Sequence, residues 1–442
     1  MKVTEQDGAG ALTQETTYTY SLLDKLTDVN QGGQLRKFKY DDLGRMLYER
    51  IPEQKALIDD GTGTMWTAKY TYTDFHAVAT RQDARGVITT YSYDQMNRLV
   101  GISYNTAGAS GVAATPSVAY SYDTTTTSPT NGLLLSVSWW LPPGQQGGQG
   151  TSYLESYSYD SLKRLSSVTR TIDGVNYTTG YGYNAASQRN RLDYPSGRVV
   201  NINRDSIGRL SSLTEPIAGT YLSGMSYNNA GQVTGLTLGN GVSESYGYDS
   251  QRLLLTSQTA TVGQTSLMNL TYNYQAQAGQ MGAGTTAGNA GQLVSVTGSI
   301  AGQTESASYS YDLLARLNTS SQTTNGVSAQ RRFVYDRWGN RTGVWDAVTG
   351  GNEIQSITIK QSGGAPTNRI QTLTNNGVTV NYDHDSNCNV TSDGQHTYQY
   401  DGENRLVTVD GGAAQYSYDH LTAVSRRWLG PRLRIVFGKG PR

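Results

Sequence analysis

The stretch Tyr91-Ser92-Tyr93-Asp94-Gln95-Met96-Asn97-Arg98-Leu99-Val100 sets the pattern on which the rest of the chain is built. Its alternating tyrosines read as the end of a strand, in which successive side chains point to opposite faces. Asp94 then opens a tight turn, because a carboxylate at this place accepts hydrogen bonds from backbone N–H groups two residues on. A second strand begins at Arg98-Leu99. The stretch therefore predicts two strands joined by a turn.

Copies of this unit recur along almost the whole chain. The close copies are Tyr40–Leu47, Tyr159–Leu165, Arg204–Leu210, Tyr311–Leu317 and Tyr400–Leu406, and looser ones begin at Tyr122, Tyr183, Tyr227, Tyr248, Tyr335, Tyr382 and Tyr418. In the close copies an arginine lies four residues after the turn aspartate, and we expect it to reach back across the turn or to stack on a neighbouring tyrosine. Positive φ is expected where the chain leaves the turn, at Gly44, Gly208, Gly231 and Gly339.

A second kind of turn alternates with the first. Four pairs predict two-residue hairpins, because both central residues tolerate positive φ: Asp173-Gly174, Asn240-Gly241, Asn325-Gly326 and Asn376-Gly377. Arg85-Gly86 and Ser196-Gly197 occupy the same slot with weaker turn chemistry. A strand of period two follows each pair, as in Val87, Thr89, Tyr91 and Tyr93. The unit is turn, strand, hairpin, strand, and the tightest copies, such as Tyr72 to Tyr93, are 21 residues long.

These units resemble those of the bacterial Rhs/YD-repeat proteins, whose relatives include the insecticidal toxin-complex cage subunits and the teneurins. The resemblance runs from about Tyr18 to about Arg427, and Pro195–Val199 and Tyr400–Leu406 are especially typical. It implies a spiral shell around a hollow interior, which houses a toxin segment or presents a surface for cell contact. It also implies a secreted or cell-surface location.

The predicted fold is all-β, with tandem hairpins side by side in a long antiparallel sheet that coils on itself and helix below about a tenth. Tyrosine at 32 residues against 4 phenylalanines suits a broad sheet that is wet on one side. We divide the chain into a polar lead-in at 1–17, the repeat shell at 18–427 with loop insertions near 141–150 and 275–291, and an atypical basic tail at 428–442.

The amino-acid composition limits the kinds of partner and location that we expect for the chain. Lysine plus arginine equals aspartate plus glutamate at 35 each, so nothing favours nucleic acid, which a basic excess would attract. Cys388 is the only cysteine, which leaves no internal disulfide. No stretch reaches the roughly 20 apolar residues that a membrane helix needs, and residues 1–6 lack the apolar core of a signal peptide.

No catalytic, cofactor or metal site is predicted, and the chain is not expected to be an enzyme. The sequence contains no Gly-x-Ser-x-Gly motif, so it offers no serine nucleophile that a histidine would activate. The histidines are His76, His384, His396 and His420. Asp383–Asn389 mimics the start of a calcium loop, but Cys388 stands at its sixth position and Gly394 at its twelfth. We interpret it instead as a stretched turn that Tyr382-Asp383 opens and Asn389 closes.

The expected function is that of a non-enzymatic shell segment of a polymorphic-toxin or cell-surface protein. Its expected partners are an encapsulated toxin polypeptide or a further shell segment. One alternative is a carbohydrate-binding adhesin, in which Trp139-Trp140 would stack on a cell-surface glycan, although paired tryptophans more often plug the end of a sheet. The other is a truncated, inactive fragment.

The tail differs from the family pattern. It contains none of the turn signals, and no Asp-Pro pair occurs in the chain, so the self-cleaving aspartyl motif of such relatives is not carried over. We therefore expect an incomplete shell whose least ordered residues lie before about Tyr18 and after about Arg427. Its open sheet edges should self-associate or need a partner chain.

Overall fold

The computed structural model describes residues 1–6, 13–140, 152–217, 219–276, 288–289, 291–347, 351–419, 424–429 and 432–435. Strands joined by tight turns make up nearly all of these ranges, which contain one 3-10 helix, η1 (Asp410–Gly412), and no α-helix. None of their helices is long and apolar enough to span a membrane. The all-β prediction is confirmed.

The first fifteen strands are β1 (Lys2–Gln6), β2 (Thr13–Tyr20), β3 (Leu26–Gln31), β4 (Gln34–Tyr40), β5 (Met46–Arg50), β6 (Ile58–Asp59), β7 (Met65–Trp66), β8 (Ala68–Tyr72), β9 (Val78–Gln82), β10 (Ile88–Tyr93), β11 (Leu99–Asn105), β12 (Val118–Tyr122), β13 (Leu134–Trp140), β14 (Ser152–Tyr159) and β15 (Leu165–Ile172). The next fourteen are β16 (Val175–Tyr183), β17 (Arg189–Asp193), β18 (Val199–Arg204), β19 (Leu210–Glu215), β20 (Gly219–Tyr227), β21 (Val233–Leu238), β22 (Val242–Tyr248), β23 (Leu255–Val262), β24 (Thr265–Asn273), β25 (Gln275–Ala276), β26 (Gly288–Asn289), β27 (Ser295–Ile300), β28 (Gln303–Tyr311) and β29 (Leu317–Thr324). The last twelve are β30 (Val327–Tyr335), β31 (Arg341–Asp346), β32 (Glu353–Ser362), β33 (Ala365–Asn375), β34 (Val378–Asn381), β35 (Asp383–His384), β36 (Val390–Ser392), β37 (Tyr398–Tyr400), β38 (Leu406–Val409), β39 (Ala414–Tyr418), β40 (Val424–Leu429) and β41 (Arg432–Ile435).

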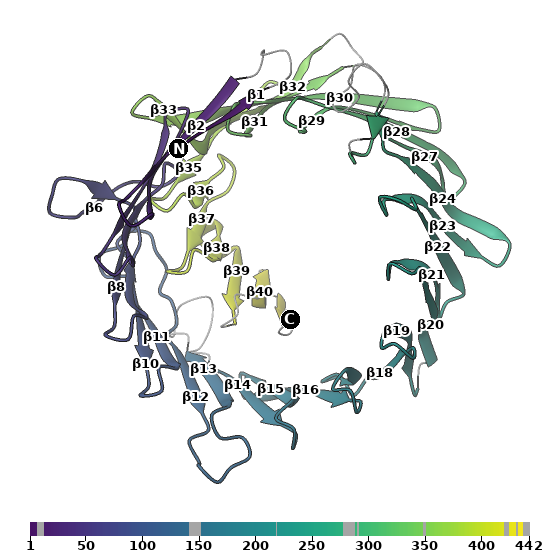
Figure 1. The fold of residues 1–442 in the computed structure, drawn as a ribbon, viewed down its shortest axis with the longest axis horizontal. Helices are drawn as coiled ribbons and strands as arrows, with labels where there is room; N and C mark the ends of the chain where they lie inside the picture. Colours follow the sequence, from purple (N-terminus) through teal and green to yellow (C-terminus); the bar gives the residue numbers. More distant parts are fainter. Residues whose placement is uncertain are drawn as a thin grey trace.

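Thirty of these strands form one antiparallel sheet in which neighbours in the sheet follow each other along the chain. Within the described ranges β1 pairs only with β2 and β34 only with β33, so the sheet is not closed. It curls into a ring around an open interior (Figure 1). The accessible surface is 24161 Å², against about 16,000 Å² for a compact monomer of this mass, as expected of a curved single layer.

The ribbon returns to its own beginning after one revolution. Figure 1 shows β31 and β33 beside β1 and β2, and the five-stranded sheet β37–β41 on the inner side of the ring. The indole N–H of Trp338 donates to the carbonyl of Gln31 at 2.8 Å, although 307 residues separate them. We call the revolution up to β29 the first coil and the chain from β30 onwards the second coil. The coiled sheet that was predicted is therefore present.

A cluster of buried apolar side chains lies where the inner sheet covers the first coil. It consists of Val137, Trp139, Tyr153 and Ile172. Trp139 and Tyr153 stack with ring centroids 5.2 Å apart, and the Trp139 indole donates to the carbonyl of Tyr418 in β39. Trp139 is 6% exposed and Trp140 is 53% exposed, so the two rings lie in different environments and form no shared platform.

The pairing extends beyond the bounds expected for the repeats. β1 pairs with β2 inside residues 1–17, and β40 pairs with β41 near the tail. At the 275–291 insertion, β25 and β26 pair across the base of the loop. The insertion at 141–150, most of 275–291, His420 and much of the tail lie outside the described residues.

Candidate functional site: the repeated lock and the seam between coils

Each close copy of the repeat closes its turn in the same way. Asp160 donates its backbone N–H to the carbonyl of Arg164, and the Lys163 N–H returns to the carbonyl of Asp160, both at 2.9 Å. The Asp160 carboxylate accepts the N–H groups of Leu162 and Arg164. A side chain of this length is needed to reach both donors, which explains why aspartate opens the turn.

The fourth residue of the turn adopts positive φ whatever its side chain. Gly44, Gly208, Gly231 and Gly339 have φ of 75° to 88°, as predicted. The same position holds Asn97, Lys163, Ala315 and Asn404 in other copies, with φ of 61° to 63°. A side chain there costs roughly 1 kcal/mol, because Cβ approaches the backbone in the left-handed region. The turn geometry is therefore imposed by the array around it.

The turn arginine makes both of the contacts that were offered as alternatives. Arg164 donates from Nε to the Asp160 carboxylate at 2.7 Å, and its guanidinium lies 4.6 Å from the centroid of the Tyr183 ring in the next unit. The Tyr183 hydroxyl donates to the carbonyl of Leu165 at 2.8 Å. Arginines that share the carboxylate contact and lie over the next tyrosine are Arg45, Arg98, Arg209, Arg316 and Arg405.

This contact, which we call the lock, joins successive units. The tyrosine covers the preceding arginine, and its hydroxyl binds the carbonyl that follows that arginine. Phenylalanine would keep the packing and lose the hydrogen bond. The lock accounts for the excess of tyrosine over phenylalanine and for the recurring Arg-Leu.

The two-residue hairpins are confirmed at three of the four pairs. Asp173, Asn325 and Asn376 have φ of 48° to 51°, and the glycine after each also has positive φ. At the fourth pair only Gly241 has positive φ. The hairpin expected at Arg85-Gly86 was wrong, since Asp83 closes a longer turn by donating to the carbonyl of Val87. The signal that would have identified it is Asp83 three residues before Gly86, the spacing of Asp41 and Gly44.

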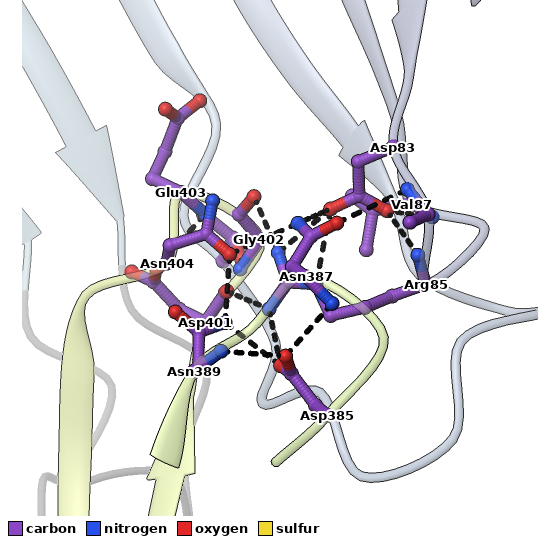
Figure 2. A network of polar contacts seen from close by, with 12 residues as sticks. Asp83, Arg85, Val87, Asp385, Asn387, Asn389, Asp401, Gly402, Glu403 and Asn404 are labelled. Carbon is purple, nitrogen blue, oxygen red and sulfur yellow. Dashed lines mark hydrogen bonds and ion pairs between the residues drawn. The ribbon is translucent and has the colours of Figure 1, made fainter. Parts of the chain in front are cut away.

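Arg85 is the centre of the contact between the two coils. Its side chain is 2% exposed and binds the Asp83 carboxylate from Nε at 3.0 Å and Nη2 at 2.8 Å. The same guanidinium donates across to the carbonyls of Asp401 at 2.9 Å and Gly402 at 3.0 Å (Figure 2). One buried cation therefore links a hairpin of the first coil to a turn of the second.

Asparagines complete this network from the second coil (Figure 2). Asn387 donates to the Asp83 carboxylate at 2.6 Å and accepts the Ala84 N–H at 3.1 Å. The Asn387 and Asn389 amides both donate to the side-chain oxygen of Asn404. A second contact of this kind joins Gln31–Gln34 to Asp336–Asn340, through Trp338 and through Asn368 of β33. We call the two contacts together the seam.

The candidate calcium loop is one of these seam turns. Asp385, rather than Asp383, opens it: the Asp385 carboxylate accepts the N–H groups of Asn387 and Asn389, and the Asn389 amide donates back at 2.7 Å. The turn is therefore of ordinary length rather than stretched. In the part of the chain that the structure describes, no three histidine, cysteine or acidic side chains gather in a way that could hold a metal ion.

Known proteins share this geometry. The Teneurin YD-shell family model matches residues 144–223. Crystal structures of TcdB2-TccC3 and of TcdB2-TccC3-Cdc42 superpose with TM-scores of 0.73 and 0.74 at 14% identity, covering 96% of this chain. The Photorhabdus luminescens Tc holotoxin pore has a TM-score of 0.58, also at 14% identity over 96% of this chain. The chain has the fold of a YD-repeat shell.

This YD-repeat shell spans 22–23% of the length of those solved chains, and at 14% identity the likeness to them concerns the fold. No curated protein matches the sequence. The repeats, the coiled sheet and the family model over residues 144–223 agree on this fold.

The histidines of the YD-repeat shell have separate surroundings. His76 contacts Arg45 through Nδ1 at 3.0 Å, and His384 is half-buried with a pKa lowered first by burial and then by Arg369. His396 lies 2.7 Å from the Asp410 carboxylate, and the hydrogen bond between them raises its pKa. The described histidines therefore do not come together in one site.

A buried ion pair that the sequence did not reveal supports the inner face. Glu155 is 1% exposed and lies 3.0 Å from the Arg170 guanidinium across β14 and β15. Burial raises the pKa of Glu155, against the effect of Arg170, and Asp419 raises it further. A glutamate in a period-two strand gives no sign of whether its face is inner or outer, so sequence alone could not find it.

Proposed function

We propose that this YD-repeat shell is a structural segment of a secreted or cell-surface toxin-type protein, and that its interior encloses polypeptide. The observation that carries the proposal is the position of β37–β39, which lie inside the ring against β10–β14 (Figure 1). The interior surface thus already accepts a folded stretch of chain. The resemblance to TcdB2-TccC3 structures supports the same reading.

The chemistry of the inner face suits a polypeptide occupant. Tyr91, Tyr104 and Tyr120 of the first coil lie near Glu403 of the inner sheet. Burial is the main cause that raises the pKa of each; Glu403 comes next for Tyr91 and Tyr104, and Tyr122 comes before Glu403 for Tyr120. Tyrosine rings offer stacking surface and hydroxyls offer hydrogen bonds, so such a face can cover many sequences. The proposal gives the wall a containing role and assigns no catalytic residue.

The carbohydrate-binding alternative receives no support from the tryptophan pair. Trp139 is buried against Tyr153, which leaves Trp140 as a single exposed ring. Sugar recognition through a paired platform would need both indole faces in solvent.

Protease protection tests enclosure. A tagged, flexible peptide of roughly a hundred residues is fused behind Arg442, and in a matched control the same peptide is fused before Met1. The proposal expects slower cleavage behind Arg442 than before Met1, and loss of the difference when Arg85→Ala opens the seam. Equal cleavage at both positions in the unmodified shell would contradict enclosure, and binding on a glycan array would favour the adhesin.

A further inference from the structure

A pocket of about 500 Å³ lies at the seam, beside the network around Arg85 but separate from it. One wall comes from the first coil, around Gln34 and Arg50–Leu57, and the other from β32 and β33 of the second coil. The volume is within the range of sites that bind small molecules. Whatever binds there contacts both coils.

The charges that line the pocket are all positive. Arg50 and Lys55 come from the first coil and Arg369 from the second, and the described residues that line the pocket include no carboxylate. Within the described residues none of these three cations forms an ion pair. Most other described arginines of the repeats pair with an aspartate or a glutamate, so this concentration of uncompensated charge is unusual for the chain.

Arg369 makes the pocket more than a charged surface. It is 5% exposed, its Nε donates to the Thr367 hydroxyl at 3.3 Å, and its buried Nη1 has no hydrogen-bond partner among the residues that the structure describes. Burying a cation without a counter-charge is costly, and the N–H donors of a buried cation are normally hydrogen-bonded. Glu53, the nearby carboxylate, is already bound to Arg36 and Asn368.

We propose that this pocket binds a small, multiply charged oxyanion, such as a phosphate or sulfate group, and that the anion clamps the two coils together. The planar guanidinium of Arg369 presents paired donors that match such oxygens, and Arg50 and Lys55 supply charge from the opposite wall. The clamp is independent of what the shell contains. A ligand that binds only the assembled seam stabilises the folded chain as its concentration rises.

Inorganic phosphate is the probe, added to the full chain at 0 to roughly 10 mM with ionic strength held constant by sodium chloride. At such concentrations the general salting effect of phosphate is small compared with site binding. We expect a saturable rise in Tm and a matching heat of binding by calorimetry. Sulfate should reproduce both, and acetate, which carries one charge, should bind more weakly.

The variants identify the site. Lys55 is exposed and Arg50 half-buried, so Lys55→Gln and Arg50→Gln should fold, and each should weaken phosphate binding about tenfold, as expected for one charge-assisted hydrogen bond. Arg369→Gln should abolish binding. Lys163→Gln, an exposed lysine on the β14–β15 turn, is the charge-matched control and should bind normally. An unchanged Tm in the unmodified chain, or equal binding by Arg50→Gln, Lys55→Gln and the control, would overturn the proposal.

Discussion

Replacing Arg85 by alanine should open the seam between the coils. The substitution removes a cation whose side chain is 2% exposed, two bonds to the Asp83 carboxylate and two donors to carbonyls of the second coil. Breaking a buried pair by removing one partner costs about 3–5 kcal/mol, because the other charge stays buried. The carbonyls of Asp401 and Gly402 lose a donor as well, so we expect the upper half of this range.

The assay is urea denaturation combined with hydrogen exchange. The free energy of unfolding should fall by about 4 kcal/mol, and protection should be lost selectively in Asp83–Val87 and Asp401–Arg405, whose amides close the seam turns. The free energy of unfolding of Arg85→Lys should lie between those of the unmodified chain and of Arg85→Ala, because an ammonium group keeps the charge but not the planar fork of the guanidinium. The reasoning is refuted if Arg85→Ala costs no more than alanine at Arg164, which makes its contacts within its own coil.

Three further predictions concern the repeats. Arg164→Ala should cost about 1–2 kcal/mol, from a partly exposed ion pair and a cation–π contact, whereas the exposed Arg191→Ala should stay within about 0.5 kcal/mol; equal losses by thermal unfolding would show that the lock contributes nothing. Gly231→Ala should cost about 1 kcal/mol in the same assay through backbone strain alone, since φ is 80° and no atom lies within 4 Å of the added Cβ; an unchanged Tm would contradict the left-handed turn. The raised pKa of His396 means that its contribution to stability is present below about pH 6.5 and is lost as pH rises through the folded value. Titration by NMR should show a His396 pKa above 6.5 in the unmodified chain, and Asp410→Asn should bring this pKa back toward 6.5. An ordinary His396 pKa in the unmodified chain would contradict the pairing with Asp410.

Local features of the fold were readable from the sequence because their causes lie within a few residues. The turn aspartates, the glycine positions and three of the four Asp-Gly and Asn-Gly hairpins depend on φ and on hydrogen bonds over two to four residues. The coiling followed from the repetition itself. The turn arginines both reach back across the turn and stack on a tyrosine, as the two predicted alternatives had it, because the next tyrosine lies one unit away along the sheet.

The seam was not readable, because its partners are more than 300 residues apart in sequence. Arg85 and Gly402 meet across 317 residues, and which turns meet depends on how many hairpins complete one revolution. That number follows from the curvature of the sheet, a sum of small twists that no single residue encodes. The start of the turn at Asp385 was predicted two residues too early, at Asp383, because the Tyr-Asp pair that marks other turns stands there.

Because particular turns pair across the seam, the fold fixes the number of hairpins in one revolution. The contacts of the seam join residues 303 to 334 apart, so a fixed number of hairpins must lie between them. Loop length is free, since Tyr122 still reaches the carbonyl of Leu99 past the long connection between β11 and β12. Deleting one complete hairpin would instead bring Arg85 opposite the wrong turn. The circumference of the interior is thus inherited in whole units, and a shell of this kind can change its loops gradually but its diameter only in steps.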